Sequence, residues 1–142
     1  ESFQAGLSWE CILNKRENFR RAYDEFDLDR VCGYDEEKIA ELCSDSSIVR
    51  NKLKIRASIS NARIFRDIVK EQGSFYDYLC KFTDGEILYE CDKTTNEWSD
   101  RISADLKKRG MKFVGSVIIY SFLQAVGVIY SHDSECGLYR EK

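Results

Sequence analysis

Apolar residues recur at helical spacing along almost the whole chain, and the sequence contains no proline to interrupt them. Ile55, Ile59 and Ala62, for example, mark one face of a long helix. Proline would remove a backbone donor and break such a helix, so its absence suits helices joined by short connections. The pattern lapses between Thr83 and Trp98, where we expect a connecting loop with a short extended piece at 87–89. We therefore predict an all-α fold.

Residues that favour helix ends stand where the helical pattern begins or stops. Gly73 and Gly110 follow two such runs, and the left-handed backbone that often ends a helix costs glycine little. The residues that we expect to cap helix N-termini are Ser8, Asp35, Ser74 and Ser99. The helix after Ser8 should continue through Tyr23. An apolar helix at 114–126 should be buried on all sides.

A chain of 142 residues can bury a sizeable core, and we expect residues 1–142 to form a single domain. Residues 113–130 are apolar but too few, and too rich in serine and glutamine, to predict a membrane span. The six cysteines contain no CxxC pair, which predicts free thiols in a reducing cytoplasm. The chain opens without methionine or an apolar leader, so we expect a segment before Glu1 to be missing.

Charge is divided unevenly along a chain whose formal net charge is −3. Residues 24–45 include nine acidic and two basic side chains, whereas residues 50–70 include seven basic and one acidic. Residues 100–112 include five basic and two acidic. A chain divided in this way can present a basic face to phosphate. Solvated helix faces with no partner would explain the same charges, so charge alone leaves both readings open.

The segment Leu106–Val117 has the layout of two helices joined by a tight turn. Gly110 ends the first helix and Gly115 precedes the second, and glycine lets a backbone approach phosphate closely. N–H groups at the start of the second helix would attract the same anion. The basic residues around the turn are Lys107, Lys108, Arg109 and Lys112. This spacing is typical of a helix-hairpin-helix at about 99–126, although an ordinary corner with exposed lysines fits equally well.

Several longer motifs occur in one order from Glu1 to about Cys136. They are Gln4-Ala-Gly-Leu-Ser-Trp9, Lys15-Arg-Glu-Asn-Phe19, Ile48-Val-Arg50 with Lys54-Ile55 and Asn61-Ala62, Leu106-Lys-Lys-Arg-Gly-Met-Lys-Phe-Val-Gly115, and Tyr120-Ser-Phe-Leu-Gln124. In this order they resemble the 3-methyladenine DNA glycosylase I family. The resemblance implies a helix-hairpin-helix DNA glycosylase fold and base-excision repair. The expected reaction is hydrolysis of the N-glycosidic bond of 3-methyladenine in alkylated DNA, by base flipping.

The resemblance also implies roles for individual residues. Glu1 would be the catalytic carboxylate of the base pocket, Trp9 would stack on the extruded base, and Leu7 would lie near the gap left in the duplex. The DNA-binding residues would be Leu7, Lys107, Lys108, Arg109, Gly110, Lys112 and Gly115. Without the resemblance, a helix-start glutamate, a core tryptophan and a core leucine would be the better interpretations.

His132 is the only histidine, and with Cys136 it forms an H-x₃-C pair that can share one helical face or turn. Two ligands alone indicate a metal only weakly. The resemblance implies a structural zinc, with His132 and Cys136 as the C-terminal half of its site and the other ligands in the segment that we expect to be missing. No catalytic cofactor is expected.

The expected partner is double-stranded DNA that contains an alkylated purine. We expect the protein to act as a monomer and not to bind a membrane. The alternative is a non-catalytic helix-hairpin-helix module that binds DNA but has lost its base pocket. Glu1, Leu7 and Trp9 favour the enzyme, because a binding module has no need of all three. The segment that we expect to be missing favours inactivity of this chain as it stands, because the family takes further pocket aromatics from there.

Overall fold

The computed structural model describes residues 1–132, 135–137 and 139. Helices dominate this part of the chain, as the sequence predicts. They are α1 (Trp9–Leu13), α2 (Arg16–Ala22), the 3₁₀ turn η1 (Asp24–Phe26), α3 (Leu28–Cys32), α4 (Glu36–Ser44), α5 (Lys52–Gln72), α6 (Phe75–Thr83), α7 (Glu97–Lys108) and α8 (Ser116–Ala125). Two short strands, β1 (Leu88–Tyr89) and β2 (Ile129–Tyr130), complete the order.

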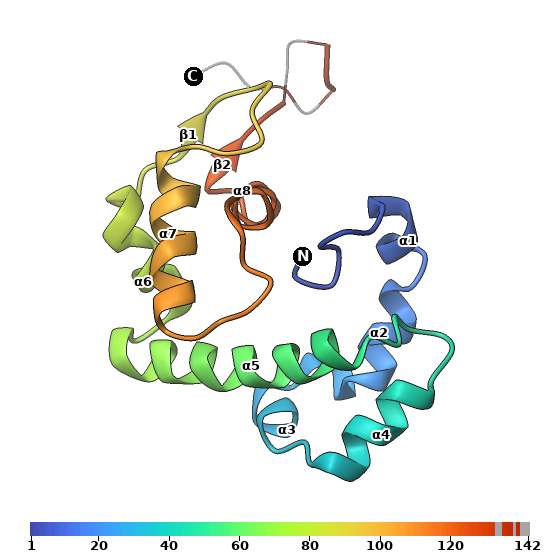
Figure 1. The fold of residues 1–142 in the computed structure, drawn as a ribbon. Coiled ribbons are helices and arrows are strands. Elements are labelled where there is room, and N and C mark those ends of the chain that lie inside the picture. The colour runs from blue at the N-terminus through green and yellow to red at the C-terminus, as the bar shows by residue number, and fades with distance from the viewer. Residues whose placement is uncertain (133–134, 138, 140–142) are drawn as a thin grey trace.

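The helices gather into two groups that share the long helix α5 (Figure 1). The N-terminal group packs α2, α3 and α4 against the first half of α5, around Tyr23, Leu42 and Ile55. The C-terminal group packs α6, α7 and α8 against the second half, around Ile68 and Leu123. Each group therefore has its own apolar core, and α5 fixes the distance between them.

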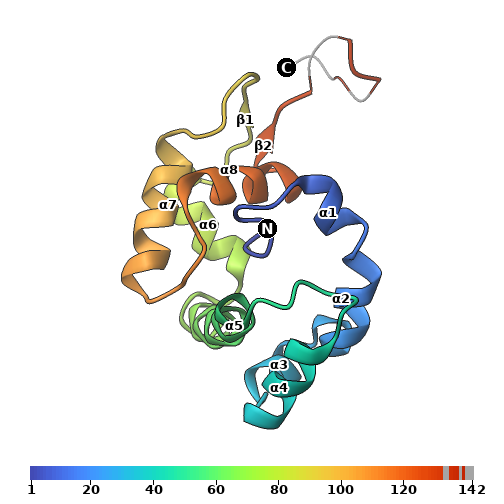
Figure 2. The same cartoon turned by 45° about the vertical axis from the view of Figure 1, so that its right-hand side comes forward.

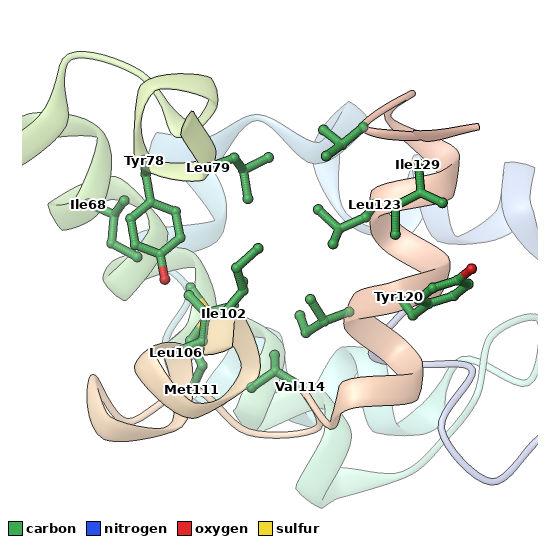
Figure 3. Packing of buried hydrophobic residues seen from close by; sticks show 12 residues of the cluster. Ile68, Tyr78, Leu79, Ile102, Leu106, Met111, Val114, Tyr120, Leu123 and Ile129 are labelled. Atoms are coloured by element: carbon green, nitrogen blue, oxygen red, sulfur yellow. The ribbon is translucent and has the colours of Figure 1, made fainter. Parts of the chain in front are cut away.

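The C-terminal core is built from side chains that meet between α6, α7 and α8. Ile102 and Leu123 are fully buried there, and Figure 3 shows Leu123 pointing from α8 toward the side chains of α6 and α7. Ser103 lies beside this core, and its hydroxyl donates to the carbonyl of Val114, 2.7 Å away. This contact satisfies a buried polar group and ties α7 to the residues before α8.

Three of the four predicted helix caps are confirmed. Ser8, Asp35 and Ser74 each accept a hydrogen bond from a first-turn backbone N–H of α1, α4 and α6. Ser99 is not the cap of α7, which begins two residues earlier, because Asn96 takes that position. Asn96 and Ser99 bond reciprocally in a capping box, so the predicted cap is the third helical residue. Gly73 ends α5 at φ 91°, as expected for glycine.

The first predicted helix is divided into α1 and α2 at Asn14 and Lys15. Lys15 N–H bonds the carbonyl of Ile12, a tighter i to i+3 contact, and its Nζ bonds the carbonyl of Ser47 at 3.0 Å. The break lets Phe19 enter the N-terminal core while Trp9 remains half exposed.

The last helix begins at Ser116, two residues later than predicted, with Gly115 as its N-cap. Its burial is also incomplete, because Val117 is 52% exposed. The predicted extended piece at 87–89 is confirmed in part: β1 pairs in parallel with β2, with Leu88 opposite Ile129. The fold class is mostly helical with this minimal sheet.

Two further features concern the cysteines and the lengths of the helices. All six cysteines carry free thiols, as the absence of CxxC pairs indicates. Within the described ranges, every helix is too short or too polar to span a membrane.

Candidate base pocket and DNA-binding hairpin

A cavity of about 760 Å³ lies between the two groups of helices. Figure 2 shows the N-terminus placed between α1, α5 and α8, and the first three residues line the cavity. Its walls are mainly apolar and aromatic. They include Phe3, Trp9, Leu13, Tyr23, Phe26, Phe65, Phe75, Met111, Val114, Ile119 and Phe122. A concave apolar space with few polar groups is the usual form of a small-molecule pocket.

Glu1 brings a carboxylate to the wall of this cavity. It begins the N-terminal turn, which we define as residues 1–7. Gln4 N–H bonds the carbonyl of Glu1 at 2.9 Å, and Leu7 N–H bonds the carbonyl of Gln4 at 2.7 Å. The Oε2 atom of Glu1 is buried and has no hydrogen-bond partner among the described residues. A buried polar atom without a partner costs free energy, so this oxygen is suited to a ligand that donates a hydrogen bond.

Trp9 shares the cavity wall with Glu1, whereas Leu7 lies on the turn between them. The Trp9 side chain is 51% exposed and Leu7 is 37% exposed. Neither is the core residue that sequence pattern alone would favour. An indole that lines a cavity and remains accessible can stack on a planar ring.

Phe26 is a cavity-lining residue that the sequence did not indicate. It lies at the end of η1, where Asp24, Glu25 and Phe26 all have positive φ, between 49° and 60°. Such backbone costs non-glycine residues about 1–3 kcal/mol each and persists only where the surroundings enforce it. The turn leaves Phe26 54% exposed and stacked against Tyr23, with ring centres 5.9 Å apart. No helical pattern predicts a left-handed turn made of ordinary residues.

The predicted hairpin lies between α7 and α8, at residues 109–115. Gly110 has φ 99°, and its N–H bonds the carbonyl of Lys107 while Met111 N–H bonds that of Leu106. These two bonds form a Schellman motif, which only glycine enters without strain. The backbone itself therefore requires Gly110.

Gly115 is not required by the chain's own packing. Its φ of −63° suits any residue, and an added Cβ would meet nothing within 4 Å. It caps α8 without a side-chain hydrogen bond, so the first N–H groups of α8 lack a side-chain partner. These features are those of a surface that a phosphate could approach closely.

Asn61 holds the hairpin to α5, a role that the sequence did not reveal. Its amide accepts from Lys112 N–H at 2.9 Å and donates to Lys112 carbonyl at 2.8 Å. Both bonds join residues 51 positions apart, a separation that local spacing cannot detect. The turn is thereby fixed while the Lys112 side chain stays exposed.

The basic residues of the hairpin differ in their freedom. The side chains of Lys107, Lys108 and Lys112 are exposed and form no ion pair with any residue in the described part of the chain. Arg109 instead bonds Asp105 and Glu71, each at 2.8 Å. These two carboxylates raise the pKa of Arg109 and occupy donors that phosphate would need. Arg109 stays a predicted DNA contact, with less of its guanidinium available than the lysines offer.

Two arginines of the basic run on α5 pair with carboxylates of the acidic segment before it. Arg56 pairs with Glu36 and Arg66 pairs with Asp29. Arg63 donates to the carbonyl of Cys32 at 2.9 Å. Internal pairing between α5 and α3–α4 therefore accounts for part of the uneven charge, whereas Lys52 and Lys70 of the same helix are exposed and form no ion pair within the described residues.

His132 and Cys136 lie together after β2, with His132 Nδ1 and Cys136 Sγ 3.1 Å apart. Imidazole nitrogen and thiolate sulfur are both zinc ligands. Within the described residues, no cluster of three or more such ligands forms. The donor chemistry fits one half of a zinc site.

The chain matches the family model described as methyladenine glycosylase over residues 1–140. It is 40% identical to DNA-3-methyladenine glycosylase 1 from Escherichia coli strain K12, over 98% of this chain and 78% of that protein. Two solved structures are also similar. A crystal structure of 3-methyladenine DNA glycosylase I superposes with a TM-score of 0.91 at 38% identity, covering 98% of this chain and 80% of that one.

The second structure concerns 3-methyladenine recognition by 3-methyladenine DNA glycosylase I from Staphylococcus aureus. It superposes with a TM-score of 0.92 at 29% identity, over 99% of this chain and 78% of that one. Sequence and structure thus point to the same group of proteins.

Proposed function

The chain belongs to the methyladenine glycosylase family, and we propose from this premise that it removes 3-methyladenine from alkylated DNA as a base-excision repair glycosylase. We propose further that residues 1–142 act as one domain on double-stranded DNA, as a monomer in the cytoplasm. The observation that carries the proposal is the buried Oε2 of Glu1, which lies in an aromatic cavity without a hydrogen-bond partner among the described residues. A pocket that binds a neutral, apolar ligand would gain nothing from such a carboxylate.

The chemistry of the substrate explains why so few polar groups suffice. Alkylation at N3 gives the base in DNA a positive charge, so the C1′–N9 bond is already weakened. When the bond breaks, its electron pair stays with the base, which leaves neutral. Water adds to C1′ and loses a proton. The protein must extrude the base, select it from adenine and stabilise the positive charge that develops on the sugar.

Glu1 and Trp9 divide these tasks. The carboxylate of Glu1 accepts hydrogen bonds from the base, and its negative charge favours a cationic base over neutral adenine. The Trp9 indole stacks on the base, and an aromatic face also attracts a cation. Leu7, exposed on the N-terminal turn, fills the space from which the base has departed. Selectivity thus rests on charge and shape together.

The hairpin holds the duplex by its backbone and carries no base selectivity. Gly115 and the first N–H groups of α8 receive one phosphate, and Lys107, Lys108 and Lys112 strengthen the field around it. Gly110 contributes by forming the turn. Arg109 acts mainly within its pairs with Asp105 and Glu71.

Reversing the charge at Lys107, Lys108 or Lys112 should weaken binding about equally on alkylated and undamaged duplex. Each lost phosphate contact should flatten the logarithmic dependence of affinity on salt by about one unit. Fluorescence anisotropy over a range of salt concentrations measures both quantities. Lys70→Glu, an exposed lysine at the far end of α5, serves as the control. A changed base preference would contradict the assignment of the hairpin.

His132 and Cys136 are proposed as half of a structural zinc site. When bound, zinc would tie the segment after β2 to further ligands and would take no part in bond cleavage. Because the described part of the chain brings two donors together where zinc takes four, the 142-residue protein should lose zinc to a chelator. Metal analysis after dialysis measures the content. Stoichiometric zinc that resists a chelator would show that other side chains complete the site.

Release of the free base tests the function itself. Methylated duplex DNA is incubated with the protein, and 3-methyladenine in the supernatant is separated by chromatography. We expect release that depends on the protein and on methylation. The competing function, a DNA-binding module without catalysis, predicts retention of duplex with no base released. That result would replace the enzyme by the module.

A further inference from the structure

Lys54 is a buried cation on α5 that neither the base pocket nor the hairpin accounts for. Its side chain is 8% exposed, and no carboxylate pairs with it in the part of the chain that the structure describes. Burial without a counter-charge is unfavourable, and it lowers the pKa of Lys54. Burying an apolar side chain at this position of the helix would cost less free energy. We therefore expect the ammonium group to make a specific contact.

The ammonium group of Lys54 holds the N-terminal turn. Its Nζ donates to the carbonyl of Phe3 at 2.8 Å and to the carbonyl of Ala5. The turn has few other long-range supports: the Phe3 ring packs on Phe19 and Tyr23, with ring centres 4.6 and 5.8 Å away. Lys54 therefore fixes the backbone that carries Glu1 at one end and Leu7 at the other.

The same ammonium group also contacts the hairpin. It lies 5.7 Å from the centre of the Phe113 ring, within the range of a cation–π interaction. Phe113 directly follows Lys112, whose backbone is clamped by Asn61. Lys54 and Asn61 are seven residues apart, two turns of α5, and so share one face of that helix. One helix face thus positions both the turn and the hairpin.

We infer that Lys54 is a positioning residue for base excision, which sets the N-terminal turn against the hairpin so that the extruded base meets Glu1. This inference rests on the proposed function. The hairpin fixes where the duplex backbone lies, and Lys54 fixes where the pocket carboxylate lies relative to it. A displacement of about 1 Å between the two can slow a reaction by roughly a hundredfold.

The test measures affinity for duplex DNA and the rate of base release separately. In Lys54→Met the side chain keeps its approximate length but loses its donors and charge. Under single-turnover conditions, the rate constant for 3-methyladenine release should fall by about tenfold or more. Affinity for undamaged duplex should stay within about twofold, because phosphate contacts are unchanged. Lys52→Met, an exposed lysine of the same helix, should alter neither quantity. Lys54→Arg, which keeps charge and donors, should release base faster than Lys54→Met.

A purely structural role predicts a different result. The amplitude of release and the Tm would fall, while the rate constant of the remaining active protein stayed at its wild-type value; that outcome would overturn the inference. If Lys54→Met does not fold, the variant Phe113→Leu is tested in its place. We expect it to release base about threefold more slowly, and an unchanged rate would contradict the inference. Wild-type protein that released no base would instead refute the proposed function.

Discussion

Replacing Leu123 by alanine should lower the free energy of unfolding by about 2–5 kcal/mol. Leu123 lies in the last turn of α8, is fully buried, and meets α6 and α7 within the C-terminal core. Truncation removes buried methyl groups and leaves a cavity, because α7 and α8 are joined by the fixed hairpin and cannot close the space freely. The Tm should fall by roughly 6–15 °C for a domain of this size.

Val117→Ala gives the matched control on the same helix. Val117 is 52% exposed, so its truncation should change the free energy of unfolding by less than about 1 kcal/mol. Urea denaturation followed by circular dichroism measures both variants. A smaller loss for Leu123→Ala than for the control would mean that the side chains of α7 and α8 do not pack closely around Leu123.

The fold could be predicted from sequence where local chemistry decides it. Ser74 caps α6 because its hydroxyl reaches a backbone N–H three residues away, and Gly110 ends α7 because only glycine enters φ 99° without strain. The break between α1 and α2 could not be predicted in this way. It depends on Lys15 reaching the carbonyl of Ser47, 32 residues away. The local spacing of apolar residues does not predict a contact between residues so far apart in the sequence.

The candidate site divides along the same line. Glu1 and Trp9 were indicated by the family motif alone, because a helix-start glutamate and a tryptophan are ordinary residues in a helical chain. Lys54 and Asn61 stand in motifs that carry the family resemblance, yet their roles depend on partners 49 to 51 residues away. A polar residue among apolar neighbours on a long helix was the available signal.

Arg109 shows what a count of charges does not reveal. Among the basic residues around the hairpin it is as prominent as its neighbours, but Asp105 lies one helical turn before it and Glu71 approaches from α5. The sequence cannot distinguish a cation that faces solvent from one that joins two helices. In this chain the lysines keep their charge available, and the arginine stabilises the junction of α5 and α7.

Glu1→Gln should reduce 3-methyladenine excision, and binding of the free base, by roughly tenfold to a hundredfold. The variant keeps the size of the side chain but replaces the carboxylate, with its buried Oε2, by an uncharged amide. One charge-assisted hydrogen bond contributes about 1.5–3 kcal/mol, which corresponds to that range in rate or affinity. Affinity for undamaged duplex should barely change, because the hairpin lysines act on phosphate and lie on other elements.

Glu10→Gln makes the same chemical change at an exposed carboxylate beside Trp9, and it should leave excision unchanged. Single-turnover base release measures the chemical step, and fluorescence anisotropy with undamaged duplex measures the affinity for DNA. The two readings separate the possible causes: a loss confined to excision places the charge of Glu1 on the cationic base, whereas an equal loss in duplex affinity would mean a disturbed N-terminal turn. Full excision by Glu1→Gln would remove this carboxylate from the mechanism and leave stacking and shape to select the base.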